Sequence, residues 1–128
     1  MSIRIRPIEA KDEQAWRKHW HSYNEFYHRV DKITEDITAN TFSRFLKSND
    51  VVDCAVAVSE SGEVVGFVTW YPHPFTGSLE DVIYLNDLFV DPECRNGGAG
   101  RKLIEHVYAE ADKKGIKTVY WHTQYFNQ

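Results

Sequence analysis

The sequence predicts an α+β (mixed α/β) fold in which helices flank a central, mostly antiparallel sheet. Three observations predict it. Apolar, strand-like runs and amphipathic helical patterns follow one another in the order β-α-α-β-β-β-α-β. Two of the runs are joined by a short polar turn at residues 60–63, which is typical of an antiparallel hairpin. The chain has 128 residues, 42% of them hydrophobic, which suits one ordered domain over residues 1–128.

The N-terminal part supplies a strand and two helices. Residues 2–8 alternate polar and apolar side chains, and Pro7 favours an edge position for this strand. Residues 12–27 predict a helix whose aromatic face carries Trp16, Trp20, Tyr23 and Tyr27. A second helix is expected at residues 34–47, where Thr34 can cap the first turn. Its buried face would carry Phe42, Phe45 and Leu46.

The middle of the chain predicts three strands. Residues 51–58 and 64–71 form the expected hairpin, and Pro72 and Pro74 are expected to end its second strand. Residues 82–90 are the most apolar stretch of the sequence. They should therefore form a central strand of the sheet.

The C-terminal part predicts a helix and a strand. The helix begins at Gly98 and ends near Lys114, with Gly115 just past its end. Its apolar side would carry Leu103, Ile104, Val107, Tyr108 and Ala111. Residues 117–122 alternate again and predict the last strand.

Composition and charge exclude several classes of function. The formal net charge is −4 and the pI about 5.8, which leaves no basic excess for a nucleic-acid backbone. The sequence has no apolar signal core at its N-terminus and no uncharged run that could span a bilayer. Cys54 and Cys94 have no zinc-site spacing, and the histidines do not cluster with other ligands. We therefore expect a cytoplasmic protein that binds no nucleic acid, membrane or metal.

A glycine-rich turn joins the strand at residues 82–90 to the following helix. It holds three glycines between two arginines: Arg95, Gly97, Gly98, Gly100 and Arg101. Unpaired N–H groups at a helix start, bare glycine backbone and two cations together suit an anion such as a phosphate. Leu103 stands where the dinucleotide-binding pattern needs glycine, and the Walker pattern is absent. A plain glycine-rich turn stays the alternative.

In this context the motif Arg95-x-x-Gly98-x-Gly100 resembles the acyl-CoA loop of the GNAT N-acetyltransferases. The resemblance covers the chain in element order and implies a GNAT-like acyl-CoA N-acyltransferase fold, with acetyl-CoA as co-substrate and no metal. It also implies that loop N–H groups hold the pyrophosphate and that the preceding strand bonds the pantetheine arm. The positions matched to these roles are Leu88, Phe89, Val90, Arg95, Asn96, Gly97, Gly98, Ala99, Gly100 and Arg101. Asn127 matches a family asparagine that contacts the pantetheine arm.

A narrower resemblance concerns the acceptor. Residues 83–90 are similar to the matching strand of diamine (spermidine/spermine) acetyltransferases, and residues 16–27 and 83–103 to the fungal histone and polyamine acetyltransferase subgroup. This implies acetyl transfer to a primary amine of a small molecule, polyamine or amino-acid-like, by direct attack in a ternary complex. A protein or histone lysine is the rival acceptor. A CoA-binding module without catalysis and a purely structural domain are the remaining alternatives.

The candidate catalytic residues are Asp87 and Asn86, which lie in the apolar strand before the loop. Burial would raise the pKa of Asp87 toward a value useful for a base. Asn86 stands where the polyamine relatives tend to carry a glutamate, so Asp87 could instead bind the cationic amine, act through a water or only bridge strands. The N–H of Phe89, or of a neighbour, is expected to polarise the thioester carbonyl.

The acceptor site is expected beside the first helix, at Tyr23, Tyr27 and Asp87. An aromatic and acidic mouth for a cationic amine could be completed by Trp20, Asn24, Asp31, Glu35 and Asp36. The alternative is that the aromatic stripe is core and the acids cap a helix.

In the family resembled, a further helix and strands follow the position of Asn127, and that helix carries a tyrosine that protonates the leaving thiolate. Because this sequence stops at Gln128, we expect the fold to lack its last helix and strands, and the general acid has no candidate. A second copy of the chain could cover the sheet edge at residues 117–122, which makes a homodimer an expected partner arrangement.

Overall fold

The computed structural model describes residues 2–122 and contains a five-stranded sheet in the order β1-β2-β3-β4-β5. Its strands are β1 (Arg4–Pro7), β2 (Asp53–Val58), β3 (Val64–His73), β4 (Val82–Val90) and β5 (Val119–Tyr120). The first four strands pair antiparallel, and β5 joins β4 in parallel. The predicted mostly antiparallel sheet is therefore confirmed, with β1 at an edge as Pro7 indicated.

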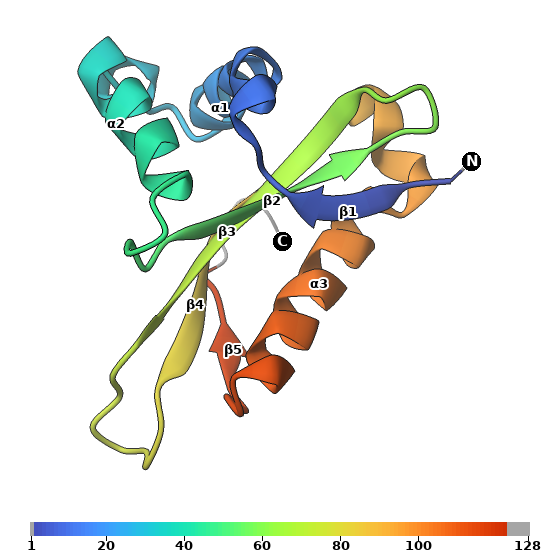
Figure 1. Ribbon diagram of the computed structural model, residues 1–128. Helices are drawn as coiled ribbons and strands as arrows, with labels where there is room; N and C mark the ends of the chain where they lie inside the picture. Colours follow the sequence, from blue (N-terminus) through green and yellow to red (C-terminus); the bar gives the residue numbers. More distant parts are fainter. Residues whose placement is uncertain (1, 123–128) are drawn as a thin grey trace.

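Helices cover both faces of this sheet (Figure 1). α1 (Glu13–Phe26) and α2 (Glu35–Phe45) lie on one face, and α3 (Ala99–Lys113) lies on the other. Thr34 caps α2 as predicted, since its side chain accepts a hydrogen bond from the N–H of Ile37 at 3.2 Å. Three short 3₁₀ turns, which the sequence pattern did not predict, are Ala10–Asp12, Val30–Lys32 and Pro92–Gly97.

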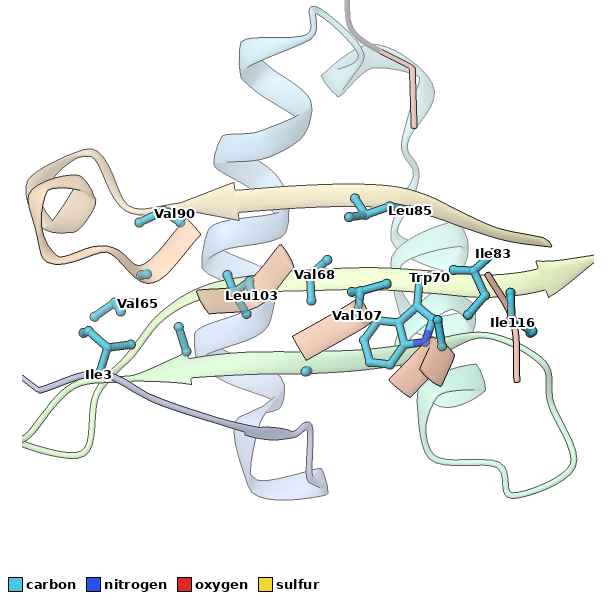
Figure 2. Close-up of a cluster of buried hydrophobic side chains, with 14 residues drawn as sticks. Ile3, Val65, Val68, Trp70, Ile83, Leu85, Val90, Leu103, Val107 and Ile116 are labelled. Atoms are coloured by element: carbon cyan, nitrogen blue, oxygen red, sulfur yellow. The ribbon is translucent and has the colours of Figure 1, made fainter. Parts of the chain in front are cut away.

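One hydrophobic core lies between α3 and the sheet (Figure 2). Leu103 and Val107 are fully buried and Ala111 is nearly so, and all three pack against side chains of β3 and β4 such as Val68 and Leu85. The predicted apolar stripe of this helix was too wide. Its buried residues recur every fourth position, whereas Ile104 is half-buried and Tyr108 turns toward solvent.

The other core lies between the sheet and the two N-terminal helices, and it is largely aromatic. Trp16 has no exposed surface and stacks on Trp20 with ring centroids 5.1 Å apart. Phe42 of α2 and Phe67 of β3 complete the same cluster. Leu46, predicted on the buried face of α2, is 45% exposed because it forms the C-cap of that helix and lies past its packed face.

The strand predictions needed two corrections. β3 continues through Pro72 to His73, although proline was expected to end it. Ile83, the residue opposite Pro72, donates its N–H to Thr118 on the other side of β4. Pro72 therefore occupies a non-hydrogen-bonded pair, where its missing N–H costs no bond to β4. The last strand is also much shorter than the predicted 117–122.

Candidate functional site

A β-bulge at Asn86 sets the geometry of the site. Thr69 of β3 pairs with Asp87 of β4, but the next residue, Trp70, pairs with Leu85, so Asn86 is an extra residue in β4. The bulge reverses the alternation of side chains along the strand. Leu85 faces the α3 core, whereas Asp87, two residues later, faces Tyr23 of α1 on the opposite side. Without the bulge, Asp87 would face α3.

Asp87 carries a buried carboxyl group whose pKa is raised above its ordinary value. Burial is the largest cause, and it outweighs hydrogen bonds from Thr69 and Tyr23 and the nearby charge of Arg29, all of which lower the pKa. The Thr69 hydroxyl donates to Oδ2 of Asp87 across the strand pair. The predicted burial of Asp87 is thus confirmed. Its hydrogen bond with Thr69 links β4 to β3. Its contact with Tyr23 joins it to a residue that lines the cavities beside β4.

Tyr23 of α1 contacts Asp87 and the backbone of the bulge. Its hydroxyl donates to the carbonyl of Asn86 at 3.4 Å and lies beside the Asp87 carboxyl group. Burial, reinforced by the charge of Asp87, raises the pKa of Tyr23 above its ordinary value. The phenol therefore stays protonated at neutral pH, and its one O–H can donate a hydrogen bond either to the Asn86 carbonyl or to the Asp87 carboxyl group.

The glycine-rich turn forms an open helix start at the end of β4. Gly98 is the N-cap of α3 and has a left-handed backbone with φ of 79°. The first hydrogen bond of the helix runs from the N–H of Lys102 to the carbonyl of Gly98, so the N–H groups of residues 99–101 precede the helical ladder. A Cβ atom on Gly98 would meet no other atom within 4 Å. The turn is thus accessible and electropositive, as an anion site requires.

The two arginines that flank the turn have different positions. Arg95 donates from Nε to the carbonyl of Val90 at 3.1 Å, which holds its guanidinium beside the end of β4. Arg101 is 84% exposed and pairs with Glu105, one turn further along α3. The structure therefore places Arg95, but not Arg101, among the residues that line the cavity next to the glycine turn. The side chain of Asn96 and all of Asn127 lie outside the described residues.

Among residues 2–122, the outer edge of β4 is paired only at its start. β5 pairs only with Ile83 and Tyr84, and beyond the bulge no described residue pairs with that edge. Asp91 donates its N–H to Val65 of β3, so by alternation the N–H of Phe89 also points to β3. Leu88 and Val90 point their backbone groups outward. The expected oxyanion donor is therefore the neighbour, Leu88, rather than Phe89 itself.

Two adjoining cavities follow this edge. The loop cavity, of about 280 Å³, is lined by Tyr23, Phe26, Tyr27, Leu88, Phe89, Val90, Arg95 and Gly100. The bulge cavity, of about 170 Å³, is lined by Tyr23, Tyr27, Leu85, Asn86, Leu88, Trp121 and His122. Tyr23, Tyr27 and Leu88 are common to both cavities. A ligand could thus extend from the glycine turn along β4 to the bulge, where Tyr23 leads to Asp87.

The predicted aromatic and acidic mouth is divided by the structure. Tyr23 and Tyr27 line the cavities along β4, but Trp20, Asn24 and Glu35 line a separate hollow between α1 and α2. Glu35 is bound there by Arg17, with a shortest distance of 2.9 Å. Glu35 therefore lies in the first turn of α2, where an acid stabilises the helix start, and it does not line the cavities along β4.

Sequence reasoning missed two residues of the site. Thr69 contacts Asp87 only because of the register on either side of the bulge, and no sequence signal marks that register. Arg29 follows the end of α1, and its guanidinium lies 5.5 Å from the ring centroids of both Tyr23 and Tyr27. A cation next to two tyrosines at helical spacing was the available signal.

Within residues 2–122 no three His, Cys, Asp or Glu side chains are grouped closely enough to hold a metal ion. The helices of this part of the chain are also too short or too polar to cross a bilayer.

Known proteins resemble this chain in sequence. A model of the acetyltransferase (GNAT) family matches residues 11–128. The chain is 39% identical over 126 residues to the D-amino-acid N-acetyltransferase HPA3 of Saccharomyces cerevisiae, covering 98% of this chain and 77% of that protein. It is 29% identical over 126 residues to the uncharacterized N-acetyltransferase YhfO of Bacillus subtilis, covering 98% and 82%.

Solved structures agree on the fold. The aminoglycoside acetyltransferase AAC(6')-Iy, in complex with a bisubstrate analog of CoA, superposes with a TM-score of 0.82 at 19% identity, over 99% of this chain and 83% of that one. A probable acetyltransferase superposes with a TM-score of 0.84 at 21% identity, over 98% and 82%.

Proposed function

The chain belongs to the GNAT acetyltransferase family and is an N-acetyltransferase, and we propose that it transfers the acetyl group of acetyl-CoA to a primary amine of a small molecule. The amine would attack directly, with both substrates bound together in a ternary complex. The observation that carries the proposal is the bulge at Asn86, because it presents Asp87 through Tyr23 beside the cavities that lead from the glycine turn.

The residues of the turn suit acetyl-CoA. Gly98 leaves the start of α3 uncovered, and Arg95 is held next to it, so the pyrophosphate would meet N–H groups and a cation. The outward backbone groups of Leu88 and Val90 would bond the pantetheine arm along the edge of β4 that no other residue of 2–122 pairs with. When bound, acetyl-CoA supplies an activated acyl group. The N–H of Leu88 would stabilise the charge that develops on the acyl oxygen.

The proton of the amine would leave through Tyr23. The tyrosine oxygen accepts a proton from the ammonium group while the tyrosine O–H gives its own proton to Asp87, so Tyr23 is neutral before and after. The raised pKa of Asp87 makes it a better proton acceptor than an exposed carboxylate. Holding the amine and the acyl group together along β4 would contribute further to the rate.

The acceptor we favour is amino-acid-like, and a polyamine is the runner-up. The relative HPA3 is by its name a D-amino-acid N-acetyltransferase. The bulge cavity is small, about 170 Å³, which suits a small amine better than the surroundings of a lysine on a folded protein. A protein or histone lysine and a non-catalytic CoA-binding role remain the alternatives to be tested.

The test is an assay of thiol release with a panel of D- and L-amino acids, spermidine, spermine and a lysine peptide, with the acetylated product identified by mass. We expect turnover of at least one small amine. Asp87→Asn and Tyr23→Phe should each lower kcat about 10²-fold or more, the size of a general-base contribution, with little change in the KM for acetyl-CoA. Unchanged kcat in both variants would reject the proposed proton path.

A further inference from the structure

We propose that Arg29 binds the carboxylate of the acceptor, so that the enzyme selects amino acids over polyamines. This inference rests on the proposed function, since it places the acceptor amine at Tyr23 and Asp87. It assigns a specificity role to a residue outside the glycine turn and outside the proton path.

The backbone of Arg29 is fixed by the turn that ends α1. His28 has a left-handed backbone with φ of 59°, and its N–H bonds to the carbonyl of Glu25 at 3.1 Å. The N–H of Arg29 bonds to the carbonyl of Asn24 at 2.8 Å. These two bonds form a Schellman motif, which folds the chain back over the last turn of the helix. The carbonyl of Arg29 then accepts from the N–H of Lys32 at 2.9 Å.

This turn brings the side chain of Arg29 over the tyrosines of the site. Its guanidinium carbon lies 5.5 Å from the ring centroids of both Tyr23 and Tyr27. The hydroxyl of the same Tyr23 ring reaches Asn86 and lies beside Asp87. One tyrosine is therefore in contact with the cation and next to the buried acid. A small acceptor lying along that ring could contact both groups.

No acid among residues 2–122 pairs with Arg29. Each of four other arginines in that range, Arg6, Arg17, Arg44 and Arg101, forms an ion pair with a side-chain carboxylate at 2.8 to 3.2 Å. Arg29 instead lies over two aromatic rings, a cation–π contact that does not use up the N–H groups of its guanidinium. An available guanidinium edge matches a carboxylate with two parallel hydrogen bonds.

Arg29 is not among the residues that line the loop cavity or the bulge cavity, but its charge acts on groups beside them. It acts to lower the pKa of Asp87, Tyr23 and Tyr84, against the larger effect of burial, which raises the pKa of all three. An α-amino acid carries its amine and its carboxylate on one carbon, so the amine can point to Tyr23 while the carboxylate meets Arg29. A polyamine would instead bring a second cation toward Arg29, and the repulsion disfavours it.

The test compares D-leucine with D-leucinamide, which differ only in the carboxylate, in both binding and turnover. Each is titrated into the chain saturated with CoA, and each is then assayed with acetyl-CoA. We expect D-leucine to bind about 10- to 100-fold more tightly, as a charged hydrogen-bonded pair provides. Arg29→Gln should remove this preference, and Arg29→Lys should keep part of it. Arg44→Gln, which removes an arginine paired with Asp50, is the matched control and should retain it.

Two binding results would overturn the proposal: equal binding of acid and amide by the wild type, or an equal loss of both ligands in Arg29→Gln. The second would mean that Arg29 only supports the two tyrosines. Preferential binding of D-leucine without turnover of any amine would uphold the carboxylate site and reject the proposed function. If the wild type turned over the amide and the acid equally, with equal KM, the proposed function would be upheld and the carboxylate site rejected.

Discussion

At Asp87, burial and hydrogen bonding act in opposite directions on one carboxyl group. Burial dominates, so the pKa lies above the ordinary value of 3.8. A carboxyl group in that condition opposes folding once it ionises, because the unfolded chain hydrates the charge better. The fold therefore retains at this residue a group that suits proton transfer and does not maximise stability.

Asp87→Asn should change how the free energy of unfolding depends on pH, because it removes the ionisable group that destabilises the fold when charged. Since the folded pKa is raised, the stabilising contribution of protonated Asp87 is complete below pH 3.8 and is lost as the pH rises through the folded pKa. The variant should match the wild type in stability at low pH and exceed it at neutral pH, where it has little activity. Thermal unfolding at a series of pH values measures the difference. A variant less stable than the wild type at neutral pH would contradict this account and favour a strand-bridging role.

Asp12 shows the opposite behaviour at the start of α1. Burial acts to raise the pKa of Asp12, but hydrogen bonds from Arg6, at 2.8 and 3.0 Å, and from the N–H of Glu9 outweigh it, and the net pKa is lowered. Its stabilising contribution is therefore complete above pH 3.8 and is lost as the pH falls through the folded pKa.

Asp12→Ala should destabilise the fold by about 3 kcal/mol at neutral pH, because it leaves Arg6 partly buried without its partner. Urea unfolding at neutral pH and near pH 3 measures this, and the difference from the wild type should shrink at the lower pH. Lys11→Ala, whose partner Glu9 is exposed, is the control and should change stability little. An equally small effect in both variants would contradict the importance of the Arg6–Asp12 pair.

At the scale of elements, the contact between β3 and β4 depends on a glycine. A Cβ atom on Gly66 would lie 2.6 Å from the carbonyl oxygen of Phe89 and 3.3 Å from Cα of Val90. These are backbone atoms of the strand proposed to hold the pantetheine arm, so they cannot move aside without shifting that strand.

Gly66→Ala should therefore cost about 1 to 3 kcal/mol in stability and also weaken acetyl-CoA binding. Gly100→Ala is a useful contrast, because its Cβ would meet only Val90 Cγ2 at 3.7 Å, an ordinary contact. Chemical unfolding should separate the two, with Gly100→Ala at least as stable as the wild type. Equal stability of Gly66→Ala and the wild type would show that β4 adjusts freely.

The elements differ in how far the sequence could predict them. β4 has the predicted bounds because its apolar run is long and ends at Pro92. α3 begins one residue after Gly98 and ends two residues before Gly115, as these glycine signals predict. The passage of β3 through Pro72 and the bulge at Asn86 depend on pairing with β4, which local sequence patterns do not encode. On the acceptor side, Thr69 reaches Asp87 only through the same pairing, whereas Arg29 reaches the tyrosines through the local turn that ends α1.

At the scale of the whole molecule, the sheet separates two tasks. α3 and its core hold the glycine turn at the end of β4, while α1 covers the opposite face and supplies Tyr23 and Tyr27 to the cavities. The strand β4 contributes side chains to both faces, and the bulge at Asn86 decides that Asp87 lies on the α1 face. Assembly as a homodimer and a cytoplasmic location stay predictions.

The central claim is that the turn at the start of α3 binds acetyl-CoA, and calorimetric titration of acetyl-CoA tests it most directly. Gly98→Trp is the variant, and Gly115→Trp is its matched control, because both glycines have a positive φ, both have open space around the Cβ position, and they lie at opposite ends of one helix. We expect micromolar binding by the wild type and by Gly115→Trp, and none by Gly98→Trp. Equal binding by both variants, or no binding by the folded wild type, would contradict the claim.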